Sequence, residues 1–111
     1  MTPLPTAFRP QFEADLLDHI DYLERKAGDV VADRFLSAVK HSIAFLAEFP
    51  NVGTRCEFTN PRLEGLRGWP IEGFRNWLLF FRRTDAGLEF IRLLHGHRNW
   101  HSLLTDEAKD T

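Results

Sequence analysis

The sequence predicts an α+β domain in which an edge strand and a helical hairpin precede a three-stranded antiparallel sheet, with the helices packed on one face. Apolar residues recur three and four positions apart in the first half of the chain and form strand-like runs in the second. The 111 residues, 43% of them apolar, allow one compact core and are too few for two. We therefore expect a single domain over residues 1–111, with a polar tail from about residue 105.

The first helix is predicted by a change of period after a short N-terminal strand. Residues Leu4 to Phe8 favour a strand at a sheet edge, because Pro3 and Pro5 have no N–H to donate. A helix then follows over residues 10–27, with Pro10 in its first turn and Gly28 as its C-terminal cap. Its apolar stripe is Phe12, Leu16, Ile20, Leu23 and Ala27, and the remaining surface carries Glu13, Asp15, Asp18, Asp21 and Glu24.

A second helix begins almost at once. Asp29 is its expected N-cap, and Pro50 ends it. Its apolar positions are Ala32, Phe35, Leu36, Val39, Ile43 and Leu46. A link this short forces an antiparallel hairpin. His19 and His41, one on each helix, are expected to be solvated or structural.

The second half predicts a loop followed by a meander of strands. Residues 51–64 mix Asn, Gly, Thr, Pro and charge without a period, which is typical of a loop. Strands are expected at Leu66–Trp69, Phe74–Arg83 and Leu88–His95, joined by turns at Pro70–Gly73 and Thr84–Gly87.

The register of the long hairpin decides which side chains share a face. If Arg83 pairs with Leu88, Arg82 faces Glu89 as an opposite-charge pair. One dry face then holds Leu78, Phe80, Ile91 and Leu93, and the other holds Arg75, Trp77, Leu79, Phe81, Phe90, Arg92 and Leu94. A helical hairpin covers one side of a sheet, so we expect the second, mixed face to bind or be covered by a partner. A bulge at the turn would exchange the two assignments.

Charge and composition limit the class of protein. The net charge is −2, but residues 11–49 hold eight acids and four bases, whereas residues 62–98 hold seven arginines and four acids. This balance argues against a chain whose whole surface grips nucleic acid, and we expect no direct DNA binding. Cys56 is the single cysteine, which suits a reducing compartment. With no secretion signal and no apolar run beyond Trp77–Phe81, we expect a soluble cytoplasmic protein without a membrane segment.

Catalytic and metal chemistry are the weaker interpretations. His95, His97 and His101 have a spacing that zinc can use, but position 101 lies beyond the strand end, so we expect no metal and no cofactor. A nuclease needs cations for developing phosphorane charge and groups that move protons. Arginines are available, but residues 66–104 contain neither tyrosine nor lysine. Tryptophan and arginine are enriched at interface hot spots, which favours protein binding, while burial of the aromatics in a core stays open as the plain alternative.

Six motifs in the correct order carry a family resemblance. They are Phe12-Glu-Ala-Asp-Leu16, Ala32-Asp-Arg-Phe35, Phe49-Pro-x-x-Gly53, Leu66-Arg67 with Trp69-Pro70, residues 73–82, and Leu94-His-Gly-His-Arg98. The chain resembles the ParE branch of the RelE/ParE toxin superfamily of bacterial type II toxin–antitoxin systems. The resemblance implies a toxin that a small antitoxin neutralises through a partly disordered C-terminal segment, and it allows a toxin–antitoxin heterotetramer.

The two branches of this superfamily differ in their targets. The mRNA-cleaving RelE branch uses two functional arginines, and Arg75 and Arg98 of this chain occupy the matching positions. For the functional lysines of that branch, this chain offers at most Arg67 as a substitute. The functional tyrosine falls on Leu103 or Leu104, which cannot act as an acid or base. The resemblance therefore favours ParE, whose members inhibit DNA gyrase, over a ribosome-dependent endoribonuclease. A module that has lost toxicity and only binds the antitoxin is a third reading. Expected antitoxin or target contacts are Arg75, Trp77, Leu79, Phe81, Phe90, Arg92, Arg98 and Trp100.

Overall fold

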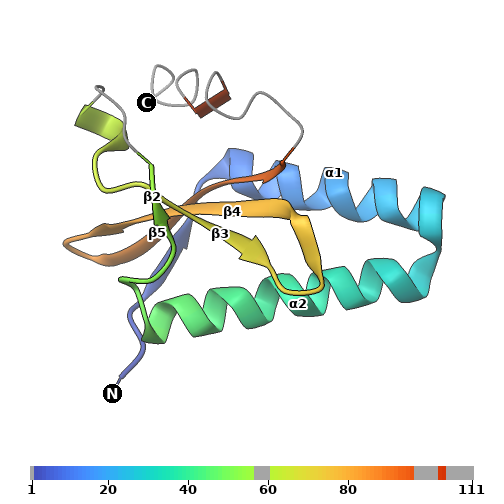
Figure 1. Ribbon diagram of the computed structural model, residues 1–111, viewed down its shortest axis with the longest axis horizontal. Coiled ribbons are helices and arrows are strands. Elements are labelled where there is room, and N and C mark those ends of the chain that lie inside the picture. Colours follow the sequence, from blue (N-terminus) through green and yellow to red (C-terminus); the bar gives the residue numbers. More distant parts are fainter. Residues whose placement is uncertain (1, 57–60, 97–102, 105–111) are drawn as a thin grey trace.

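The computed structural model describes residues 2–56, 61–96 and 103–104 and has two helices against a five-stranded sheet (Figure 1). The sheet order is β1-β5-β4-β3-β2, with β1 and β5 parallel and every other pair antiparallel. This confirms the α+β class. The elements are β1 (Thr6–Phe8), α1 (Pro10–Ala27), α2 (Asp29–Glu48), β2 (Thr54–Arg55), the short 3₁₀ helix η1 (Pro61–Leu63), β3 (Arg67–Ile71), β4 (Phe74–Thr84) and β5 (Gly87–His95).

The N-terminal strand lies at a sheet edge, as its prolines predict. Thr6 pairs with Leu88 and Phe8 with Phe90. Pro5 lacks a backbone N–H but contributes its carbonyl, which accepts a hydrogen bond from the Leu88 N–H at 2.9 Å.

The two helices meet at a single residue. Gly28 has φ of 92° and donates its N–H to the carbonyls of Leu23 and Glu24, so it ends α1 as expected. Gly28 also occupies the N-cap position of α2, and no side chain caps that helix. The expectation that Asp29 is the N-cap was therefore wrong, because Asp29 already lies in the first turn.

The β3–β4 connection is tighter than predicted. Ile71 pairs with Phe74, which leaves Glu72 and Gly73 as the turn, and Gly73 has φ of 81°. Pro70 belongs to β3 rather than to the turn. It is tolerated because β2 is only two residues long and pairs with Arg67 and Gly68, so it does not extend along β3 as far as Pro70. β2 itself lies within the predicted loop over residues 51–64 and was missed.

A β-bulge in β5 places Leu93 and Leu94, relative to the residues before them, on the sides of the sheet opposite to those predicted. Near the turn the predicted register is correct, since Arg83 pairs with Leu88 and Arg82 forms an ion pair with Glu89 at 3.0 Å. Between Phe80 and Phe81 the register shifts, so that Phe81 pairs with Phe90 but Phe80 pairs with Arg92. The side facing the helices consequently includes Leu79, Phe81, Phe90 and Leu93, and the other side includes Leu78, Phe80, Ile91 and Leu94.

Each side of the sheet has its own apolar cluster. The helices cover one side with Phe12, Leu23, Phe35, Val39 and Leu46. On the other side Leu63, Leu66 and Leu104 pack against Phe80 and Ile91. The expectation of a second face open to a partner was therefore wrong, because the chain covers that face itself. No helix in the described part of the chain is long and apolar enough to span a bilayer.

Candidate functional site

Helix α1 takes the place of a neighbouring strand along the last part of β5. Strand β1 pairs with β5 only as far as Phe90, although β5 continues to His95. Beyond that point α1 contacts β5, and the backbone of Leu93 meets two α1 side chains instead of another strand. The polar edge of the sheet is thereby satisfied within the chain.

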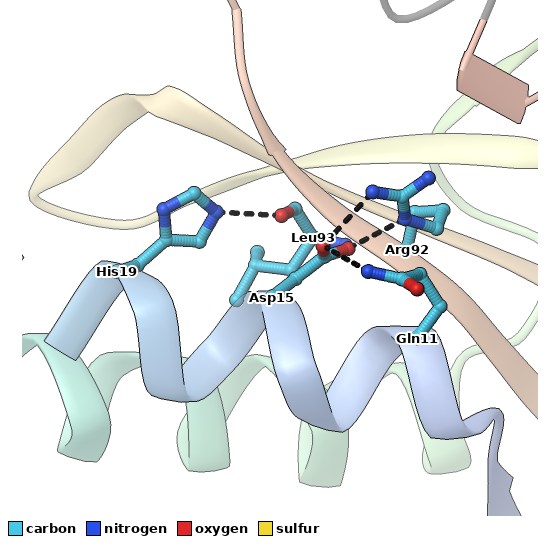
Figure 2. A network of polar contacts seen from close by, with 5 residues as sticks. All are labelled: Gln11, Asp15, His19, Arg92 and Leu93. Carbon is cyan, nitrogen blue, oxygen red and sulfur yellow. Dashed lines mark hydrogen bonds and ion pairs between the residues drawn. The ribbon is translucent and has the colours of Figure 1, made fainter. Parts of the chain in front are cut away.

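Asp15 and His19 make these contacts from adjacent turns of α1 (Figure 2). The Leu93 N–H donates to the Asp15 carboxylate at 3.0 Å, and the Leu93 carbonyl lies 2.7 Å from His19 Nε2. Because a carbonyl only accepts, His19 Nε2 carries the hydrogen of this bond. His19 is therefore structural, one of the two roles expected for it.

Arg92 completes the network through a two-pronged ion pair. It donates from Nε and Nη2 to the two Asp15 carboxylate oxygens at 2.7 and 2.9 Å, and Gln11 adds a bond to Asp15 at 3.4 Å. Asp15 is 6% exposed and Arg92 is 8% exposed. The sequence placed Asp15 on the solvated surface and Arg92 on an open face, and both placements were wrong. An arginine within the otherwise apolar Phe90–Leu94 run was the available signal for a buried acidic partner.

Trp77 lies at the centre of an aromatic cluster beside this network. Its ring contacts Phe35 and Phe74 at centroid distances of 5.4 and 6.3 Å, and it meets His19 and His95 edge-on at 6.0 and 4.7 Å. The indole Nε1 is buried without a hydrogen-bond partner among the described residues. Trp77 therefore links α1, α2, β4 and β5 at one end of the core.

A hollow of about 450 Å³, here named the α1–β5 pocket, opens beside this cluster. Its lining includes the Asp15–Arg92 ion pair and the aromatic rings of Tyr22 and Trp77. Its lining residues are Gln11, Asp15, Asp18, His19, Tyr22, Trp77, Arg92, Leu94 and His95.

A second hollow of about 680 Å³, the α2–β3 groove, lies on the other helix. Arg75 is exposed at its border, and the 40% exposed ring of Phe45 stacks on Trp69 at 5.4 Å. The remaining lining residues are Ser37, Ala38, His41, Ser42, Pro70 and Glu72.

The structure separates the residues that the sequence grouped as a binding face. Leu79, Phe81 and Phe90 are 0% exposed beneath the helices, so their assignment to an open face was wrong. Arg75 and Trp77 do border hollows, but different ones. Arg98 and Trp100 lie outside the described residues, as do His97 and His101.

The two described arginines of the nuclease interpretation lie far apart. Arg67 pairs with Phe81, which is six residues along β4 from Arg75 and therefore roughly 20 Å away at the usual strand rise. Arg67 also donates from Nη1 to the Gly53 carbonyl at 3.4 Å. These two cations are not arranged to hold one phosphate between them.

Comparison with known proteins identifies the family of this chain. The family model described as the ParE toxin of the type II toxin–antitoxin system parDE matches residues 7–100. The chain belongs to the ParE toxin family. No curated protein sequence matches it.

A solved structure shares the ParE-like fold. It is described as the chromosomal ParDE TA system from P. aeruginosa, and one of its chains superimposes with a TM-score of 0.68 at 17% sequence identity. The match covers 83% of this chain and 95% of that one. The part matched by the ParE family model ends before Leu104, so the apolar cover that Leu104 gives to the sheet lies outside it.

Proposed function

We propose that this ParE-family toxin inhibits DNA gyrase by protein–protein contact in the cytoplasm and is neutralised by a cognate antitoxin. The observation that carries the proposal is the separation of Arg67 from Arg75 by roughly 20 Å along the sheet. Cleavage of RNA needs converging groups that stabilise charge and move protons. Among residues 2–56, 61–96 and 103–104, Arg67 and Arg75 do not converge in this way, which supports action by contact with a surface of the target.

The proposed antitoxin contacts are the members of the predicted set that border a hollow. Arg75 at the α2–β3 groove and Trp77 in the α1–β5 pocket are retained. Arg92 also lines that pocket, but its guanidinium is buried in the ion pair with Asp15. The antitoxin's C-terminal segment is disordered alone and folds along the toxin surface, so one segment can reach both sides of the helical hairpin. Arg98 and Trp100 stay in the proposed set by sequence position.

The proposal is tested in cells by inducing the chain and examining plasmid topology. We expect growth arrest with loss of negative supercoiling, and recovery when the cognate antitoxin is co-expressed. Primer extension on ribosome-associated messages in the same cells is the discriminating control. Cleaved messages together with normally supercoiled plasmids would contradict gyrase inhibition and indicate ribonuclease activity. Unaffected growth would indicate a module that only binds the antitoxin.

A further inference from the structure

The α1–β5 pocket combines aromatic walls with one carboxylate that has no partner in the described part of the chain. The rings of Tyr22 and Trp77 line it, and Tyr22 is 46% exposed. Asp18 belongs to the same lining and is exposed, and across residues 2–56, 61–96 and 103–104 it makes no hydrogen bond or ion pair. Aromatic faces attract cations through their quadrupole, and a free carboxylate adds a full charge.

The carboxylate of Asp15 and the guanidinium of Arg92 in this pocket already neutralise each other. Arg92 is neutralised by Asp15, whose two oxygens accept from Arg92, from the Leu93 N–H and from Gln11. Asp18 therefore supplies the unbalanced charge among the carboxylates and guanidinium of the lining. The pocket has the character of a receptor for a cation.

We infer that the α1–β5 pocket receives an arginine side chain presented by a partner protein. Arginine fits better than lysine because its planar guanidinium stacks on aromatic rings while its N–H groups pair with a carboxylate in a fixed fork. Naming the antitoxin as that partner rests on the proposed function, whereas the chemistry of the pocket does not.

The chemistry is tested on the full chain with Nα-acetyl-argininamide as the probe and its citrulline analogue as a neutral isostere. The Trp77 indole N–H resonance reports on the pocket. We expect the arginine probe to shift this resonance saturably and the citrulline probe to bind at least about fivefold more weakly, since only the former carries the charge. Equal shifts with both probes, or no shift with either, would overturn the inference.

Two aspartate variants locate the binding. Asp18→Asn should weaken the arginine probe at least about fivefold. Asp21→Asn should leave it unchanged, because Asp21 lies on the same helix but pairs with Arg25 at 3.1 Å outside the pocket. Equal affinities for the two variants would refute the assignment of the site.

Calorimetry with the antitoxin then tests the identity of the partner. Asp18→Asn should weaken that complex and Asp21→Asn should not, and equal weakening or none would overturn the role of the pocket in antitoxin binding. Failure of the unmodified chain to bind the antitoxin would instead contradict the proposed function, because the arginine probe needs no antitoxin.

Discussion

Asp15 joins α1 to the sheet through a carboxylate that is almost completely removed from water. It accepts hydrogen bonds from Nε and Nη2 of Arg92 and from the backbone N–H of Leu93. These two residues lie 77 and 78 positions away in the chain. A buried ion pair of this kind is costly to break, because removing one partner leaves the other charge uncompensated. At the residue scale, we therefore expect the fold to be sensitive to the loss of this contact.

Replacing Asp15 tests this contact. We expect Asp15→Asn to lower the free energy of unfolding by about 3–5 kcal/mol, since Arg92 would stay buried without a counter-charge. Urea denaturation monitored by tryptophan fluorescence measures the change. Asp21→Asn is the matched control, because its ion pair with Arg25 is 66% exposed on both sides and should be worth less than about 1 kcal/mol. Similar losses for the two variants would show that the buried pair is not special.

The thiol of Cys56 gives a prediction about pH. Burial raises the pKa of this thiol above its usual value, because the charged thiolate is poorly solvated there. At any pH near neutrality the folded protein should therefore hold less thiolate than the unfolded chain, and alkylation by iodoacetamide should be slower. The rate is measured against pH with and without urea. A folded-state profile whose midpoint lies at or below that of the unfolded chain would contradict the prediction.

The sequence predicts individual residues well only where the evidence is local. The pairing of Arg82 with Glu89 follows from a short hairpin and is confirmed. The ion pair of Asp15 with Arg92 joins residues 77 positions apart. Helical periodicity identifies only the apolar stripe, so it groups Asp15 with the exposed acidic residues of α1.

At the scale of elements, the hairpin of β4 and β5 shows how register escapes a sequence. Leu78, Leu79, Phe80 and Phe81 are all large and apolar, so no alternation of polar and apolar side chains fixes which of them faces the helices. The bulge lies in β5, where the register skips Ile91, and it reverses the sides of Leu93 and Leu94 relative to the residues before them. The strands themselves were predictable from their composition, but the assignment of their faces was not.

The cover on the outer side of the sheet is testable at a single leucine. Leu104 is 0% exposed and packs with Phe80 and Ile91. Leu104→Ala should cost about 2–5 kcal/mol of unfolding free energy through lost burial and the cavity left behind. Thermal denaturation measures the loss. Leu17→Ala, at a leucine that is 67% exposed on α1, should change stability much less. If both variants have the same melting temperature as the unmodified protein, Leu104 does not cover the sheet.

At the scale of the whole molecule, the order of elements was predictable and the closure of the surface was not. Spacing alone places both helices and the three central strands. The two-residue β2 is too short to leave a pattern. The contribution of Leu63, at the end of η1, and of Leu104 to the outer side depends on contacts with strands distant in the sequence, which spacing does not reveal. Because the chain itself covers both sides of the sheet, the candidate contacts lie in the hollows beside α1 and α2 and not on a sheet face.

The central claim is that the protein inhibits gyrase by contact rather than by turnover. The most direct measurement holds gyrase at a fixed concentration and follows its supercoiling activity while purified toxin is added. We expect supercoiling activity to fall in proportion to added toxin, to end at a fixed ratio of toxin to gyrase, and to return when the antitoxin is added. Full supercoiling activity at saturating toxin would contradict it.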